Sequence, residues 1–296
     1  MHGWQEPAGG ESNAPGFFAP QGAFWRVNRE NVLMLGAGCT LLLQLAHPLV
    51  AAGVAEHSTF RKHPLRRLYA TLRRTQQVLY GDRATALAAA RGLRAVHARV
   101  RGTLKQRTSV FPAGTSYRAD DPPLLLWVFA TLVAASLSTY EQFRAPLDRD
   151  ERSEYYAQSK VLARLFGIDE EVLPRDYPAF SGYFEDMLQG PALTVTETSA
   201  CLAQAVLRPP IRLAPAFLLE WHRLITTALL PPVLRERYRL AWDEEQERRW
   251  QAFRGRMTRA LPVLPEFVRA APGALWAEHR WKRTQRRLGA SSAAAN

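Results

Sequence analysis

Two long uncharged segments constrain what this chain of 296 residues can fold into. Residues 31–55 contain 25 positions in a row without a formal charge, and residues 122–140 form a second such run. A run of about 18 apolar residues is long enough to cross a bilayer. However, Gln44, His47 and Pro48 interrupt the first run near its middle, and the basic residues flanking both runs set no membrane orientation. We therefore expect buried central helices rather than membrane spans.

The first run also invites a nucleotide-binding interpretation, because Gly36 and Gly38 follow a short apolar stretch. A dinucleotide-binding turn has the pattern Gly-x-Gly-x-x-Gly between a strand and a helix, with an acidic residue after the next strand. Leu41 stands at the third glycine position, and no β-branched second strand follows. These departures argue against a nucleotide site.

Helical periodicity governs most of the remaining chain, and no run of alternating strands occurs. Apolar residues recur at helical spacing in residues 64–81, 82–104, 150–167 and 241–261. Asp82 and Asp150 are the expected N-caps of two of these helices, and Gly81 and Gly167 are expected helix ends.

The predicted fold class is therefore all-α, with a single large helical domain at residues 17–285. Residues 1–16 are rich in Gly, Pro, Ser and Asn and are predicted to form a disordered arm, and residues 286–296 a disordered tail. Cys39 and Cys201 are too few for a disulfide framework or a zinc cluster. The N-terminus lacks a signal-peptide pattern, so we expect a cytoplasmic location.

The net charge of +12 comes mainly from arginine, because only four of the 39 basic residues are lysines. Arginine richness of this kind often follows codon composition, so we do not predict nucleic-acid binding. An anionic membrane surface or an acidic cofactor is compatible with the charge, and peripheral membrane contact therefore remains an expectation.

Four polar residues lie within or just after the first uncharged run: Gln44, His47, Glu56 and His57. A buried polar group without a partner costs about 1–3 kcal/mol, so these side chains need partners inside the protein. These residues could line a buried reaction site. They could equally be ordinary polar residues that cap helix ends.

His97 is the candidate metal ligand. Its neighbours at i−4 and i+3 are Leu93 and Val100, so the imidazole shares an apolar helix stripe. A core histidine bonded to a carbonyl explains this position. An axial ligand of haem b explains it too, since Arg94 and Arg101 would suit the haem propionates.

Arg67 and Thr71 are four residues apart and share one helix face. A guanidinium and a hydroxyl in this arrangement could orient a bound dioxygen or peroxide. The alternative is a surface arginine beside a helix-interior threonine.

Other metal and hydrolase patterns do not occur in the sequence. Glu-x-x-His, which di-iron bundles use in pairs, is absent, as are His-Glu-x-x-His and Gly-x-Ser-x-Gly. A single histidine beside an apolar pocket is the redox arrangement that the sequence permits.

Eight segments carry a family resemblance: LLLQLAHPLVAAGVAEHSTF, PLRRLYATLRR, VLYGD, VHARVRG, YRADDPPLLLWVFATL, YYAQSKVLARLFGI, LPRDYPAFSGYF and LLPPVLRERYRLAW. In this order they resemble the catalytic domain of the rubber-oxygenase, or latex-clearing-protein, family, which includes the fungal membrane-bound oxygenase of mycophenolic acid synthesis. The resemblance covers most of the chain. It implies a mostly helical fold around haem b, and in the best-understood branch the oxygenative cleavage of a polyisoprenoid.

The resemblance also implies roles for individual residues. His97 in VHARVRG matches the axial histidine, and Arg67 and Thr71 in RLYAT match a polar pair beside the haem. Glu56 is the nearest candidate for the family's acidic catalytic residue, and His57 is a second candidate for proton transfer.

One position departs from the rubber-cleaving branch. Ala70 stands where that branch has a lysine able to occupy the distal face of the iron. The sequence therefore predicts an oxygenase or peroxygenase-like oxidoreductase that uses haem b iron on a hydrophobic small molecule. The alternative is a non-catalytic helical protein that binds lipid or another apolar ligand at a membrane surface.

Overall fold

The computed structural model describes residues 15–57, 64–209 and 214–293, without the side chains of residues 64–68 and 287–293. Helices make up most of this part of the chain, which confirms the predicted all-α fold class. The first elements are α1 (Ala23–Asn28), the 3-10 helix η1 (Asn31–Gly36), α2 (Ala37–Leu45), α3 (Pro48–His57), α4 (Pro64–Tyr80), α5 (Arg83–His97), the strands β1 (Arg101–Thr103) and β2 (Ser116–Arg118), and α6 (Pro122–Phe143).

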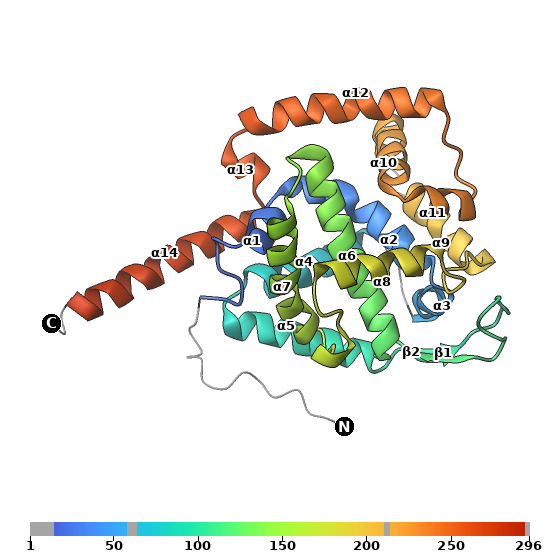
Figure 1. Ribbon diagram of the computed structural model, residues 1–296, viewed down its shortest axis with the longest axis horizontal. Coiled ribbons are helices and arrows are strands. Elements are labelled where there is room, and N and C mark those ends of the chain that lie inside the picture. The colour runs from blue at the N-terminus through green and yellow to red at the C-terminus, as the bar shows by residue number, and fades with distance from the viewer. Residues whose placement is uncertain (1–14, 58–63, 210–213, 294–296) are drawn as a thin grey trace.

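The second half of the chain continues the helical arrangement, and Figure 1 shows α12 along one edge of the molecule and α14 projecting from the other helices. Its elements are α7 (Arg149–Leu165), η3 (Glu170–Val172), α8 (Tyr177–Gln189), α9 (Glu197–Leu207), α10 (Ala216–Leu229), α11 (Pro232–Arg237), α12 (Glu244–Ala260), η4 (Leu261–Val263), α13 (Glu266–Arg269) and α14 (Pro272–Ala293).

Helix α6 is the second uncharged run and lies at the centre of the fold. It packs against η1, α2, α7, α8, α10 and α12, and its side chains enter each of the apolar clusters of the described core. The helix is long and apolar enough to cross a membrane, yet 67% of its most apolar window is buried. Burial against neighbouring helices explains its composition, as the sequence predicts.

The first uncharged run divides at Pro48. The segment 31–45 and helix α3 meet at an angle of 107°. Pro48 occupies the first position of α3, where its missing N–H costs no helical hydrogen bond. Helix α2 and the first half of α3 are buried, whereas Ala55, Glu56 and His57 are exposed. The bend therefore directs the polar end of the run away from α6.

Gly36 and Gly38 are sites of close helix packing rather than parts of a nucleotide-binding turn. A Cβ at Gly36 would lie 2.3 Å from Oγ1 of Thr139 on α6, and one at Gly38 would lie 2.2 Å from Oγ1 of Thr226 on α10. Both threonines are buried. The two glycines thus let α6 and α10 approach the start of α2 closely.

Side-chain caps fix several helix starts. Asp82 accepts the N–H of Thr85 at 2.7 Å, which confirms it as the N-cap of α5. Helix α7 begins differently from the prediction, because Asp148 rather than Asp150 is its N-cap. Asp148 accepts the N–H of Glu151, and the Glu151 carboxylate accepts the N–H of Asp148, which forms a capping box.

Helix α5 is shorter than its apolar pattern predicts. It ends at His97, and residues 101–103 pair antiparallel with residues 116–118 as β1 and β2. Val100 and Leu104 were expected on the helix, but they instead pack in a cluster with Leu49 and Tyr117. Apolar spacing could not distinguish these alternatives, because a short strand also buries alternate side chains.

Helix α14 continues to Ala293, through most of the segment 286–296 that the composition predicts to be disordered. Its alanines and arginines have high helix propensity, so a polar sequence can still extend a helix that is anchored at its beginning. Residues 1–14 of the predicted arm and residues 294–296 lie outside the described residues.

We expect Gly38→Ala to lower the free energy of unfolding by about 1–3 kcal/mol, because the new methyl group overpacks against buried Thr226. Gly182→Ala is the matched control: nothing lies within 4 Å of its added Cβ in helix α8, so alanine should be neutral or stabilising by up to about 1 kcal/mol. Urea titration of both variants measures the difference. Equal stability of the two would contradict the packing role of Gly38.

Candidate functional site

His97 is the last residue of α5, and the helix holds it half-buried. The Asp82 cap fixes one end of α5, and packing against α4 and α7 fixes its orientation. The Nδ1 atom of His97 is buried. A histidine at a helix C-terminus lies near the negative end of the helix dipole, which favours basic groups there.

The two predicted arginine partners lie on either side of His97 along the chain. Arg94, one turn earlier, is half-buried, and a Cβ at Gly167 would lie 3.0 Å from its Cδ. Gly167 has a φ of +89°, so glycine is required at this turn for backbone reasons as well. Arg101 begins β1, is exposed, and donates to the carbonyl oxygen of Ala98 at 3.1 Å.

Glu56 lies at the centre of a polar cluster where α3 meets the β1–β2 hairpin. Its Oε2 accepts the hydroxyl of Tyr117 at 2.6 Å, and its Oε1 lies 3.3 Å from Nζ of Lys105. Gly102 is opposite Tyr117 in the hairpin, and a Cβ there would lie 2.5 Å from Oε2 of Glu56. The glycine therefore lets the carboxylate reach the tyrosine.

This cluster keeps Glu56 ionised. The hydrogen bond from Tyr117 lowers the pKa of Glu56 below its usual 4.5, and the charge of Lys105 lowers it further. Burial, together with the neighbouring carboxylate, raises the pKa of Tyr117. At neutral pH, Glu56 is a carboxylate that can accept a proton.

The structure brings Glu56 and His57 near the segment that follows His97. Nε2 of His57 lies 3.0 Å from the carbonyl oxygen of Arg101, and the carbonyl oxygen of His97 accepts the N–H of Val100. The end of α3 and the end of α5 therefore meet at the start of β1. Tyr117 and Lys105 were not predicted from the sequence, because only the hairpin brings them to Glu56.

The other two polar residues of the first run have a different environment. Nε2 of Gln44 donates to Oγ1 of Thr131 at 3.2 Å, between α2 and α6. His47 is 5% exposed, lies 5.4 Å from the ring of Phe111, and has an Nδ1 atom without a hydrogen-bond partner. Burial lowers the pKa of His47 to about 4, so the ring is neutral. The four polar residues thus do not form one site.

Thr71 lies on the exposed side of α4, and Ala70 before it is also exposed. The side chain of Arg67 lies outside the described residues, so the predicted Arg67–Thr71 pair remains a prediction. Positions 67 and 71 are about 40° apart around the helix, whereas Gln76 is about 140° from Thr71. The predicted pair and the pocket described next therefore belong to different faces of α4.

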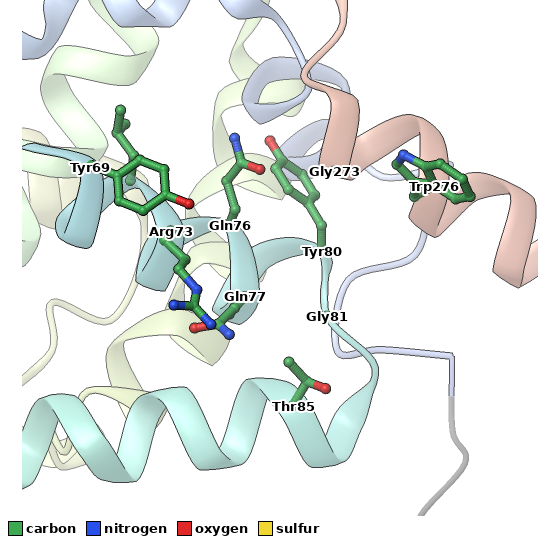
Figure 2. A pocket seen from close by; sticks show the side chains of 10 residues that line it. Tyr69, Arg73, Gln76, Gln77, Tyr80, Gly81, Thr85, Gly273 and Trp276 are labelled. Atoms are coloured by element: carbon green, nitrogen blue, oxygen red, sulfur yellow. The ribbon is translucent and has the colours of Figure 1, made fainter.

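A pocket of about 450 Å³ lies between α4, the turn into α5, and α14 (Figure 2). It is lined by Tyr69, Leu72, Arg73, Gln76, Gln77, Tyr80, Gly81, Thr85, Gly273 and Trp276. A Cβ at Gly273 would lie 2.7 Å from Tyr80, so this glycine allows α14 to approach α4. The sequence offered no signal for this pocket, since its walls come from segments about 200 positions apart.

Within the described residues, no group of three or more His, Cys, Asp or Glu side chains could hold a metal ion. Haem iron needs fewer protein ligands, because the porphyrin supplies four nitrogens and a single histidine can supply the axial ligand. The half-buried imidazole of His97, with an arginine on either side along the chain, fits this demand.

A sequence model of the family described as "ER-bound oxygenase mpaB/B'/Rubber oxygenase, catalytic domain" matches residues 25–260. The chain belongs to this family. The match begins within α1 and ends with α12, so it includes His97, Glu56 and Thr71 but no residue of α14. It confirms the resemblance seen in the sequence motifs and makes this chain an oxygenase-type catalytic domain.

The chain is also similar to two mycobacterial proteins. It is 29% identical over 230 residues to the uncharacterized protein Rv2237 of Mycobacterium tuberculosis. The aligned region covers 74% of this chain and 84% of the relative. The uncharacterized protein Mb2261 of Mycobacterium bovis has the same identity and coverage. No solved structure matches the chain.

We expect Tyr117→Phe to lower the free energy of unfolding by about 1–2 kcal/mol at neutral pH, because Glu56 loses a hydrogen bond to its charged form. The folded pKa of Glu56 is depressed, so its stabilisation is complete above pH 4.5 and is lost as the pH falls through the folded value. The difference between wild type and variant should therefore shrink in acid. Denaturant titration at several pH values measures it.

Tyr69→Phe is the control, because the Tyr69 side chain is largely exposed. It should leave stability unchanged across the same pH range. A Tyr117→Phe deficit that stays constant down to pH 3 would contradict the coupling to Glu56.

Proposed function

We propose that this protein is a haem-b-dependent oxygenase whose axial ligand is His97. Membership of the oxygenase family supports the reaction class. The placement of His97, half-buried at the end of a capped helix, is the single observation that supports the residue assignment. Haem, when bound, would supply the oxygen-activating redox chemistry.

The protein's own residues would bind and orient that group. Arg94 and Arg101 carry charges of the sign that pairs with two propionates, one turn before and four residues after His97. Thr71, with Arg67 one turn earlier in the sequence of α4, would supply a hydroxyl donor for orienting the oxidant. Glu56 is held as a carboxylate by Tyr117 and Lys105, so it would accept a proton rather than donate one.

The proposed substrate is a hydrophobic small molecule rather than a rubber polymer. Ala70 replaces the lysine of the rubber-cleaving branch, so the distal side differs from that branch at the residue next to Thr71. Peripheral attachment to a membrane from the cytoplasm is part of this proposal, since α6 is mostly buried in the fold.

A second candidate function is non-catalytic binding of an apolar ligand. The aromatic pocket between α4 and α14 favours it, because His97 and Thr71 are not among the residues that line that pocket. The visible spectrum of purified protein distinguishes the two candidates, since only the oxygenase requires iron.

We expect His97→Ala to lose bound haem or to shift its Soret band strongly, because the substitution removes the axial nitrogen. His279→Ala is the matched control, since His279 is an exposed residue of α14. Haem content by the pyridine haemochrome assay and the visible spectrum measure the effect. Wild-type haem content and spectrum in His97→Ala would refute the assignment.

We expect the ferric protein to be high-spin and to bind imidazole readily, because alanine at position 70 cannot coordinate iron. Ala70→Lys should convert the spectrum to low-spin and weaken imidazole binding by about 10-fold or more. Ala70→Leu is the control, because leucine adds bulk at this position without a nitrogen ligand. A low-spin resting spectrum that disappears in His57→Ala would instead identify His57 as a second ligand.

A further inference from the structure

Two exposed aromatic side chains border the pocket between α4 and α14. Tyr69 is 68% exposed and Trp276 is 76% exposed. Figure 2 shows them on either side of Gln76 and Tyr80, with the two rings contributed by different helices. Single apolar residues on a surface are ordinary, but two large rings at the rim of one pocket indicate a binding surface.

The two helices that form this rim are strongly basic. Helix α4 contains four arginines and no acidic residue, and α14 contains five basic residues and one glutamate. That glutamate, Glu278, is directed into the protein, where it accepts from Nε1 of Trp25 at 2.8 Å and lies 3.2 Å from Nε of Arg29. Its charge is therefore already paired, and the exposed charge of the two helices is positive.

Two exposed arginines and a histidine of α14 share a face with Trp276. His279, Arg283 and Arg286 are exposed and follow Trp276 by three, seven and ten residues, which places all four along one side of the helix. Ala274 and Ala277 are buried on the opposite side. Figure 1 shows α14 projecting from the other helices, so this side is accessible along its length.

We propose that the surface formed by Tyr69, Arg73, Trp276, Arg283 and Arg286, the α4–α14 surface, binds an anionic lipid bilayer. Tyrosine and tryptophan rings are favoured at the level of lipid headgroups, where one end of the ring stays hydrated. Arg73 lines the pocket and offers a guanidinium to a lipid phosphate. Arg283 and Arg286 attract the negative surface of the bilayer.

The inference rests on the peripheral membrane attachment in the proposed function and names the surface that makes it. That surface does not include His97 and does not require bound haem. It would hold the protein against a membrane in which a hydrophobic molecule is dissolved. A failure of membrane binding would leave the haem spectrum unchanged, and a failure of haem binding would leave vesicle binding unchanged, so the two proposals can be refuted separately.

Vesicle sedimentation with the full chain tests the proposal. We expect binding to equimolar phosphatidylcholine–phosphatidylserine vesicles, weak binding to phosphatidylcholine alone, and loss of binding as salt concentration rises. Trp276→Ala and Arg283→Glu should each weaken binding about 10-fold. Both residues are exposed, so the variants should fold, and circular dichroism checks this.

Phe217→Ala and Arg256→Glu are the matched controls. Phe217 is 59% exposed at the start of α10, and Arg256 is exposed on α12; neither residue lines the pocket between α4 and α14. They should bind vesicles as well as wild type. Loss of binding in the controls, or full binding by Trp276→Ala and Arg283→Glu, would overturn the proposal.

Quenching by brominated lipid provides a second measurement. Bromine in the acyl chains near the headgroups should quench the fluorescence of wild type more than that of Trp276→Phe, because Trp276 would lie at that depth. Equal quenching of the two proteins would overturn the proposal. Equal binding to neutral vesicles, or binding of inorganic phosphate or a single-stranded oligonucleotide without vesicle binding, would also overturn it.

Discussion

The fold depends on the burial of α6, a helix of 22 residues with apolar side chains on every face. On the surface, such a helix would expose apolar side chains to water, so other helices must cover it on all sides. Thr131, a buried polar residue of this helix, is satisfied from within: its Oγ1 donates to the carbonyl oxygen of Val128 at 2.7 Å and accepts from Nε2 of Gln44. The positions of η1, α2, α7, α10 and α12 follow from the need to cover it.

Close approach of the surrounding helices has consequences for the site. Gly36 and Gly38 bring the start of α2 against buried threonines of α6 and α10, so the direction of the first uncharged run is fixed before it reaches Pro48. The 107° bend then carries α3 to the β1–β2 hairpin. Glu56 meets Tyr117 there, beside the chain that leaves His97. The position of Glu56 therefore depends on helix packing at Gly36 and Gly38 and on the bend at Pro48, which are distant from it in the chain.

The predicted Arg67–Thr71 positions and the α4–α14 surface occupy different faces of α4. Thr71 belongs to one face of α4, whereas Tyr69, Arg73 and Gln76 line the pocket with α14. If both proposals hold, this one helix would connect the reaction site with the membrane-binding surface. The family match ends at residue 260, so α14, which completes the pocket, lies outside the matched region.

The sequence by itself determined the all-α class, the buried role of the two uncharged runs, the cap at Asp82, and the family, because these depend on local periodicity and on linear motifs. It did not determine the end of α5 or the cap of α7, since competing local patterns were equally compatible. Only the tertiary structure decided that Glu56 meets Tyr117 and Lys105, that Gly38 meets Thr226, and that α14 closes a pocket on α4. The physical reason is that each of these contacts joins residues far apart in the chain, and their meeting depends on how whole helices pack.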